Sequence, residues 1–509
     1  MRKSGILLAI SSLPSKYGIG TFSKEAYDFV DFLKESGQTL WQILPLGPTG
    51  YGDSPYQSFS TFAGNPYYID LDEFIDMGWL TEKECEKYNY GHKNYVEYSV
   101  IFEAKFALLK KAFKKSGLGL SADKNAKSDE TAEYQDILKK DYEEFKKENA
   151  AWLDDYALYM AVKYSLDGVS WTLWPDDIKT RSVNALKKYR KELAEDMEFY
   201  YFQQFFFYKQ WKMLKGYANA NGIQIVGDIP IYVAMDSADT WSHPELFDLD
   251  EDCNPVNVAG CPPDAFTALG QLWGNPLYKW DYHKETEYAW WMERLEHSFG
   301  LYDIVRIDHF RGFDEYYAIP FGRENAVIGE WLPGPGYDLF RCMKEKLGKR
   351  QVIAEDLGYL TDSVIKMVKK TGFPGMKVLQ FGFYNNSDSD YLPHNYGKNC
   401  VVYTGTHDND TTRHWYDTLN RKDKAFTKGY LDVKTPKDAV DKMIRAGLGS
   451  VADTCIVPMQ DYLGLGGEAR MNFPSTMGTN WKWRLSSDMI SDSLAEKIYK
   501  LCRLYGRAK

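Results

Sequence analysis

Eight short apolar runs, rich in aliphatic and β-branched residues, recur along the chain, and each is bounded by polar residues, glycine or proline. They cover residues 6–10, 39–44, 223–229, 304–308, 351–355, 377–383, 400–406 and 454–460. Most are nearly continuous and do not alternate with polar positions, which is typical of parallel strands buried on both faces. The pattern predicts eight strands of one parallel sheet.

Amphipathic helical periodicity lies between several of these runs, for example over residues 23–36, 337–347, 363–371 and 436–448. Strands that alternate with helices in this way predict an α/β fold, a (β/α)8 TIM barrel. We expect residues 1–509 to form one catalytic barrel with large, mainly helical insertions. No separate C-terminal β-sandwich domain is expected.

The spacing of the strands predicts where the insertions lie. The interval between the second and third runs far exceeds the ~30 residues of a typical βα unit, and residues 81–218 within it are rich in Lys, Glu, Ala and Leu. We expect a helical subdomain there. Residues 231–300 are rich in Trp, Pro, Gly and Asp. They predict an irregular segment that contacts substrate.

Composition excludes several classes of protein. A mean hydropathy of −0.48 with 44% hydrophobic residues is ordinary for a globular protein, and no apolar run reaches the ~18 residues of a membrane span. The net charge of −10 disfavours nucleic-acid binding. The run at residues 6–10 is too short for a secretory signal, and the seven scattered cysteines suit reduced thiols. We therefore expect a cytoplasmic protein that binds neither membrane nor nucleic acid.

Aromatic residues are the informative excess, at 16% of the chain with 38 Tyr and 15 Trp. Large hydrophobic cores account for most of them. Aromatic faces also stack on the C–H faces of sugars or on bases, while the polar tips of Tyr and Trp still form hydrogen bonds. Composition alone gives only a hint of carbohydrate.

Three of the predicted strands lead into a carboxylate: Asp308, Glu355 and Asp408. Catalytic groups of a (β/α)8 barrel lie at this end of the strands, and two carboxylates flanking a sugar bond suit retaining glycosidic chemistry. Arg306 and Asp308 are two residues apart, so both point into the barrel. The guanidinium is expected to lower the pKa of Asp308 and keep it ionised, as a nucleophile must be. Alternatively, the two form a buried ion pair that only closes the barrel.

Glu355 is the candidate general acid/base, because burial and nearby Asp charges raise the pKa of a carboxylic acid. The adjacent Asp356 faces the opposite way if the strand continues, so it is the weaker candidate. Alternatively, Glu355 caps the following helix, a role that Asp356 or Thr361 fills as readily.

His407, Asp408 and Asp410 lie within four residues, a grouping that also occurs in metal sites. Only eight His occur in the whole chain, so partners for a metal are few. We interpret His407 as a donor to a sugar hydroxyl and Asp408 as a carboxylate that orients two hydroxyls. His309 and His414 are interpreted as structural. Neither a metal nor an organic cofactor is required, since proton transfer and a carboxylate nucleophile suffice.

The three carboxylates, in this order and on these strands, resemble those of the α-amylase superfamily. Longer strings over nearly the whole chain resemble one branch of it, the amylomaltases or 4-α-glucanotransferases, whose plant relatives are called disproportionating enzymes. The matching strings are GILL at 5–8, SSLP at 11–14, LGPTGYGDSPYQ at 46–57, GDIPIYV at 227–233, GQLWGNP at 270–276, GGEARMN at 466–472 and NW at 480–481. Such strings are far more specific than a three-residue motif.

The resemblance implies that Asp308 is the nucleophile that forms a β-linked glycosyl-enzyme, Glu355 the acid/base and Asp408 the transition-state stabiliser. The same matches imply supporting or substrate-binding roles for Arg306, His407, Asp228, Asp264, Gln271, Trp273, Ser54, Tyr56 and Asn480. For Trp273 the alternative is a core tryptophan, although the flanking glycine and proline favour an exposed loop.

The implied activity is retaining transfer of α-1,4-glucan segments from a maltodextrin donor to the 4-hydroxyl of an acceptor glucan or glucose. Maltooligosaccharides, amylose, glycogen and starch are the implied partners. A hydrolytic α-glucanase with the same carboxylates and a glucan-binding protein on an inactive barrel are the rival interpretations. Tyr232 and Val233 replace the Asn-His pair of α-amylases, which argues against an ordinary amylase. Ala265 and Tyr384 replace a Tyr and an Asp of some relatives, so specificity does not transfer.

Overall fold

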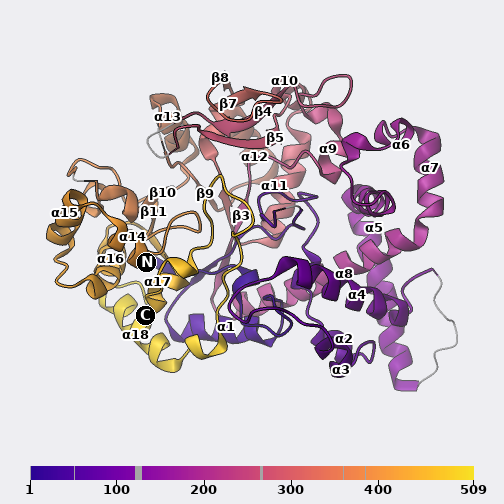
Figure 1. Cartoon of the computed structure of the whole chain (residues 1–509), viewed down its shortest axis with the longest axis horizontal. Coiled ribbons are helices and arrows are strands. Elements are labelled where there is room, and N and C mark those ends of the chain that lie inside the picture. The colour runs from indigo at the N-terminus through magenta and orange to yellow at the C-terminus, as the bar shows by residue number, and fades with distance from the viewer. Residues whose placement is uncertain are drawn as a thin grey trace.

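The computed structural model describes residues 2–50, 52–120, 129–263, 267–358, 360–384 and 386–508. Eight parallel strands close into a barrel (Figure 1). In chain order they are β1 (Lys3–Leu7), β2 (Leu40–Gln42), β3 (Gln224–Ile229), β6 (Ile304–Ile307), β9 (Val352–Ala354), β10 (Gly375–Val378), β11 (Cys400–Tyr403) and β12 (Thr454–Pro458). Strand β1 pairs with both β2 and β12, which closes the ring. The predicted (β/α)8 barrel is confirmed.

The interior of the barrel is filled by its own hydrophobic cluster, to which every strand contributes. Its buried members are Leu7, Leu40, Val226, Ile304, Ile353, Met376, Val378, Val401, Tyr403 and Ile456. A much larger core lies outside the strands and includes residues of the surrounding helices. The strands are therefore buried on both faces, which is why their sequence runs are continuous.

Two apolar runs extend beyond the strands that they predict. Ile10–Ser12, after β1, and Leu379–Gly382, after β10, are short 3-10 helices. Most residues just after both strands remain buried. An apolar run indicates burial whatever the backbone conformation, so it could not mark the residue at which each strand ends.

Helices cover the outside of the barrel (Figure 1). They are α1 (Lys24–Glu35), α11 (Ala289–Leu301), α12 (Tyr337–Leu347), α13 (Asp362–Thr371), α14 (Thr412–Thr418), α15 (Arg421–Leu431), α16 (Ala439–Gly449), α17 (Met459–Leu463) and α18 (Asp492–Leu504). Side-chain caps fix helix ends: Thr361 accepts from the Val364 N–H at the start of α13, and Gly372 ends it with φ of 74°. Helix α18 packs against α1, and the described chain contains no separate C-terminal β-sandwich.

The segment between β2 and β3 contains helices throughout its described part. They are α2 (Asp72–Asp76), α3 (Glu82–Glu86), α4 (Tyr98–Ser116), α5 (Asp129–Ser165), α6 (Asp176–Lys179), α7 (Val183–Glu192) and α8 (Ala194–Ala220). Helix α5 packs along α8, and α4 to α7 lie beside the barrel, at the right of Figure 1. Helix α8 also packs on α1 and β3, where Tyr217 contacts Tyr27 of α1. It is therefore a barrel helix as well as part of this helical group.

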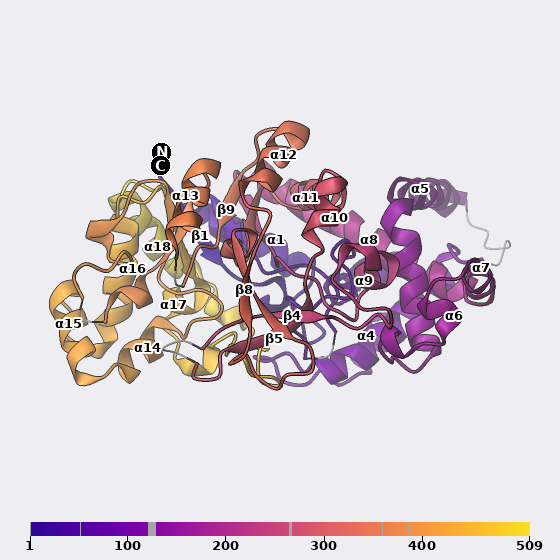
Figure 2. The ribbon, with the colours of Figure 1, turned by 90° about the horizontal axis from the view of Figure 1, so that it is seen from above.

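The segment between β3 and β6 contains regular elements that the sequence did not predict. They are α9 (Ala238–Ser242), β4 (Asn257–Cys261), β5 (Gln271–Pro276) and α10 (Trp280–Glu285). Strands β4 and β5 join β7 (Glu315–Pro320) and β8 (Glu330–Pro333) in an antiparallel sheet of order β5-β4-β7-β8. This sheet lies between α4–α7 on one side and α14–α16 on the other (Figure 2). Because β4 pairs with β7, which follows β6, local sequence could not reveal the pairing.

Across the described ranges, no helix is both long enough and apolar enough to cross a membrane.

Candidate active site

The carboxyl ends of neighbouring barrel strands bring the predicted polar residues together. Asp228 ends up beside Arg306 because the two are partners in the β3–β6 register. Asp308 follows β6 directly, and Glu355 follows β9, whose register places Ala354 opposite Ile307. The site therefore forms from residues that are far apart in sequence but adjacent around the barrel.

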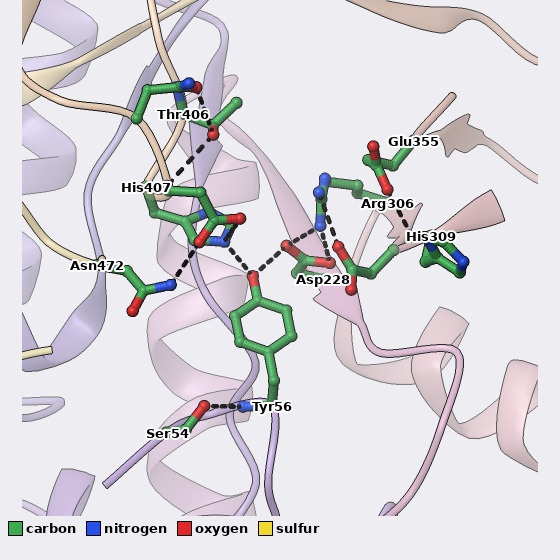
Figure 3. A network of polar contacts seen from close by, with 12 residues as sticks. Ser54, Tyr56, Asp228, Arg306, His309, Glu355, Thr406, His407 and Asn472 are labelled. Carbon is green, nitrogen blue, oxygen red and sulfur yellow. Dashed lines mark hydrogen bonds and ion pairs between the residues drawn. The ribbon is translucent and has the colours of Figure 1, made fainter. Parts of the chain in front are cut away.

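Arg306 is a buried cation shared by two carboxylates (Figure 3). Its Nη1 lies 2.7 and 2.6 Å from the two oxygens of Asp228, and its Nη2 lies 2.9 Å from Asp308 Oδ1. Burial raises the pKa of Asp308, and the guanidinium of Arg306 opposes this shift. The expected lowering of that pKa is therefore wrong in direction, because desolvation outweighs the single cation. The ionised form of Asp308 depends on Arg306.

Glu355 is held by backbone donors. The His309 N–H donates to Oε2 at 2.7 Å and the Leu357 N–H donates to Oε1 at 3.0 Å. Burial raises the pKa of Glu355, against the effect of Arg306 and of both N–H groups. The neighbouring Asp356 faces away and accepts the Met376 N–H at 2.7 Å. A carboxylic acid with a raised pKa is suited to donating a proton near neutral pH.

Tyr56 and His407 complete the network on the side of Asp228 (Figure 3). The Tyr56 hydroxyl donates to Asp228 Oδ2 at 2.9 Å and lies 2.8 Å from His407 Nε2. The two rings stack with centroids 5.3 Å apart. Burial lowers the pKa of His407, which favours the neutral ring. Because the Tyr56 proton points to Asp228, we assign the remaining ring proton of His407 to Nε2.

Asp408 is more exposed than Asp308, with 43% of its side chain accessible against 28%. Asn472 Nδ2 donates to its Oδ1 at 2.6 Å, and His407 Nε2 lies 3.4 Å from its Oδ2. Arg470 donates to the Asp408 carbonyl at 3.0 Å. Sequence reasoning did not single out Asn472, although it ends the GGEARMN string. The amide orients Asp408 while leaving it open to a ligand.

For the maltodextrin substrates that the sequence resemblance implies, such as maltotriose, replacement of Asn472 by Ala is expected to lower kcat/KM by ~10-fold, since a hydrogen bond to a charged group contributes ~1.5–3 kcal/mol. The matched control is Asn219→Ala, which removes another Asn–Asp hydrogen bond of 2.8 Å, to Asp303 just before β6. Steady-state kinetics on both variants checks this. Equal effects of the two substitutions would contradict an orienting role for Asn472.

Trp273 and His309 form a contact between β5 and the residue after Asp308. Their rings meet edge to face with centroids 4.8 Å apart, and Trp273 Nε1 donates to Gln271 Oε1 at 3.1 Å. His309 has a left-handed backbone with φ of 49°, uncommon for a residue other than glycine. Burial lowers its pKa to about 3, so its ring is neutral at physiological pH. The structure thus places His309 in the site, where sequence reasoning assigned it only a structural role.

The remaining predicted residues form hydrogen bonds within loops or lie outside the described residues. Ser54 Oγ accepts the Tyr56 N–H at 3.3 Å and so supports the Tyr56 loop. The side chain of Asn480 is buried, and its hydrogen bonds run to Phe473 and Thr476 within its own loop. Its neighbour Trp481 lies 5.7 Å from the Tyr56 ring. Asp264 and Ala265 lie outside the described residues.

Comparison with known proteins agrees with this geometry. The family model for 4-alpha-glucanotransferases matches residues 8–490. The chain belongs to this family. It is 49% identical to the 4-alpha-glucanotransferase of Clostridium butyricum over 98% of this chain and 100% of that protein. It is 45% identical to the Thermus thermophilus 4-alpha-glucanotransferase over 95% of each chain, and 39% identical to the chloroplastic/amyloplastic Solanum tuberosum protein over 99% of this chain and 86% of that one.

Solved structures agree with membership in the 4-alpha-glucanotransferase family. The amylomaltase from Streptococcus agalactiae in complex with acarbose superposes with a TM-score of 0.93 at 41% identity, covering 100% of both chains. The Corynebacterium glutamicum amylomaltase shares the fold, with a TM-score of 0.77 at 18% identity over 100% of this chain and 75% of that one. These matches confirm the predicted amylomaltase branch and the predicted class of enzyme.

The structure places two residues of this 4-alpha-glucanotransferase family member that differ from other proteins, Tyr232 from α-amylases and Tyr384 from some amylomaltases. Tyr232 is buried, with its ring 6.3 Å from Trp273 and stacked on Tyr278 at 6.1 Å. It therefore packs against Trp273 of β5. Tyr384 is 45% exposed and follows the 3-10 helix after β10.

Proposed function

We propose that the chain transfers α-1,4-glucan segments with retention of configuration, using Asp308 as nucleophile, Glu355 as acid/base and Asp408 as transition-state stabiliser. The observation that carries this proposal is the pairing of two differently held carboxylates on adjacent strands. Asp308 is paired with the Arg306 guanidinium, whereas the hydrogen bonds that Glu355 accepts from the described residues come from the backbone N–H groups of His309 and Leu357. Environments that differ in this way suit one carboxylate to nucleophilic attack and the other to proton transfer.

The first step breaks the donor glycosidic bond. A carboxylate oxygen of Asp308 attacks the anomeric carbon, and Glu355 gives its proton to the departing glucan oxygen. In the second step Glu355 takes the proton of an acceptor 4-hydroxyl, whose oxygen attacks the anomeric carbon and releases Asp308. Two inversions give net retention, and one glycosidic bond is made for each one broken.

The other residues of the site would hold the sugar. Asp408 would accept hydrogen bonds from two hydroxyls of the reacting glucose, with Asn472 fixing its orientation. Trp273 would offer an aromatic edge beside the acid/base, supported by Gln271. Residues 231–300 would then form a substrate-contacting insertion, since Gln271 and Trp273 lie on β5 within it.

Substrate class and location follow the same reasoning. The donors are maltooligosaccharides, amylose, glycogen or starch, and glucose is an acceptor. We place the protein in the cytoplasm, because its seven cysteines are scattered along the sequence and odd in number, which suits reduced thiols. The chemistry described uses side chains alone.

The choice between transfer and hydrolysis depends on whether the site excludes water while it holds a second sugar. Incubation of the purified protein with maltotriose alone tests this. We expect glucose and a ladder of longer maltodextrins, with the number of reducing ends nearly constant. Products are resolved by chain length while reducing ends are counted.

Two other outcomes would contradict the proposal. A rise in reducing ends without products longer than maltotriose would identify a hydrolytic α-glucanase. No change with maltotriose or with longer maltodextrins, together with retained glucan binding, would identify a glucan-binding protein on an inactive barrel.

A further inference from the structure

We propose that Tyr56 is a positioning residue whose hydroxyl keeps the nucleophile Asp308 ionised, acting through Asp228 and Arg306. This inference rests on the proposed function, in which Asp308 attacks as a carboxylate. The resemblance to amylomaltases implies only a glucan contact for Tyr56. The hydrogen bonds of its hydroxyl point to an additional role.

The direction of the hydrogen-bond chain is fixed by its members. Asp228 is buried, and both of its carboxylate oxygens accept hydrogen bonds from Arg306 Nη1. A carboxylate has no proton of its own, so it can only accept. The single proton of the Tyr56 hydroxyl must therefore point to Asp228, and its oxygen accepts from His407 Nε2. A continuous chain runs from His407 through Tyr56 and Asp228 to Arg306, which in turn bonds Asp308 (Figure 3).

Charge is unevenly balanced around Asp308. Among the described residues, the carboxylates of Asp228 on β3, Glu355 after β9 and Asp408 after β11 raise the pKa of Asp308, and the guanidinium of Arg306 lowers it. Arg306 must also neutralise Asp228, which it contacts through both carboxylate oxygens. The negative charge of Asp228 also repels that of Asp308 and so opposes its ionisation.

The Tyr56 hydroxyl relieves this competition. Its O–H dipole points its positive end at Asp228 Oδ2 and so offsets part of the field that this carboxylate exerts on Asp308. The neighbouring residues Arg306 and His407 are each 3% exposed. Hydrogen bonds to charged groups are stronger in such surroundings than in water. Tyr56 thus supplies a second donor to the pair of carboxylates that share one guanidinium.

The test is Tyr56→Phe, which keeps the ring that stacks on His407 and removes only the hydroxyl. Loss of the donor raises the pKa of Asp308, so the acidic limb of kcat/KM is expected to move up by about 0.5 to 1 pH unit. The substrate is α-glucosyl fluoride with maltose as acceptor, since fluoride departs without a proton from Glu355. The limb then reports the nucleophile alone.

A KM-against-kcat comparison separates positioning from sugar binding. At pH values on the acidic limb, kcat should fall by ~3- to 10-fold, as a limb shift of about 0.5 to 1 pH unit requires, while KM changes by less than ~3-fold. An unmoved limb, or a rise in KM alone, would show that Tyr56 is only a glucan contact and would overturn the inference. Circular dichroism and a thermal melt establish that the variant is folded.

A matched control is Tyr403→Phe. Tyr403 is another buried tyrosine of the barrel interior, and its hydroxyl donates to the neutral Gln42 amide at 2.8 Å. Its removal should leave the acidic limb in place. Replacing Tyr56 by 3-fluorotyrosine, a stronger donor, should move the limb to lower pH, and a shift upward would again overturn the inference.

Failure of the proposed function gives a different result. If Asp308→Asn still turned over α-glucosyl fluoride, Asp308 would not be the nucleophile and the reaction scheme itself would be wrong. If Asp308→Asn is inactive and Tyr56→Phe leaves the limb unmoved, only the positioning role of Tyr56 is lost.

Discussion

Replacement of Asp308 by Asn is expected to reduce glucan transfer by ~10⁴-fold or more, because loss of a covalent nucleophile removes the intermediate itself. Asparagine has the same shape and can still accept from Arg306 Nη2, which lies 2.9 Å from Asp308 Oδ1. The loss would therefore come from chemistry, with the fold retained. The measurement is turnover of maltotriose, together with mass spectrometry of protein quenched during reaction with α-glucosyl fluoride.

Asp356→Asn is the matched control. Asp356 is also a carboxylate at the end of β9, but it accepts the Met376 N–H and so faces away from the site. The Asp356→Asn variant should keep most of its maltotriose turnover even if its unfolding temperature is lower. A covalent glucosyl adduct on the Asp308→Asn protein, or comparable losses in the two variants, would contradict the assignment of the nucleophile.

The sequence could predict the barrel and its three carboxylates because both depend on local signals. A parallel strand buried on two faces leaves a continuous apolar run, and the residue after that run lies at the mouth of the barrel. Asp308 and Glu355 are placed in this way, directly after β6 and β9. The apolar runs could not define strand ends, because Leu8, Ala9 and Ile10 stay buried after β1 ends.

The parts that sequence reasoning missed depend on contacts between distant segments. Strand β4 pairs with β7, which lies beyond β6, so no local period reveals the small sheet. Asn472, which donates a hydrogen bond to Asp408, lies in a loop after β12. His309 enters the site through a left-handed backbone, which sequence patterns do not show. The pKa of Asp308 was predicted in the wrong direction because the extent of its desolvation is a property of the assembled barrel.

Glu355→Gln is expected to lower turnover of maltotriose by ~10²- to 10⁴-fold, the range of a general acid/base contribution, while glucan binding persists. Glutamine cannot protonate the leaving oxygen or deprotonate an acceptor hydroxyl. It also loses one of the two backbone hydrogen bonds from His309 and Leu357, since an amide nitrogen cannot accept an N–H. That loss costs ~1–3 kcal/mol of stability and is checked by a thermal melt.

The role of Glu355 is separated from this structural loss by substrates that need no proton transfer. With α-glucosyl fluoride the first step of Glu355→Gln should stay fast, so a glucosyl-enzyme on Asp308 should accumulate and be seen by mass spectrometry. Azide, a nucleophile that needs no base, should then restore turnover and yield α-glucosyl azide, because the second inversion still occurs. In the unmodified enzyme, maltotriose turnover should fall as pH rises through the pKa of Glu355, which burial raises. That basic limb should be absent from Glu355→Gln acting on the fluoride. Failure of azide to restore turnover in a folded variant would exclude Glu355 as the acid/base.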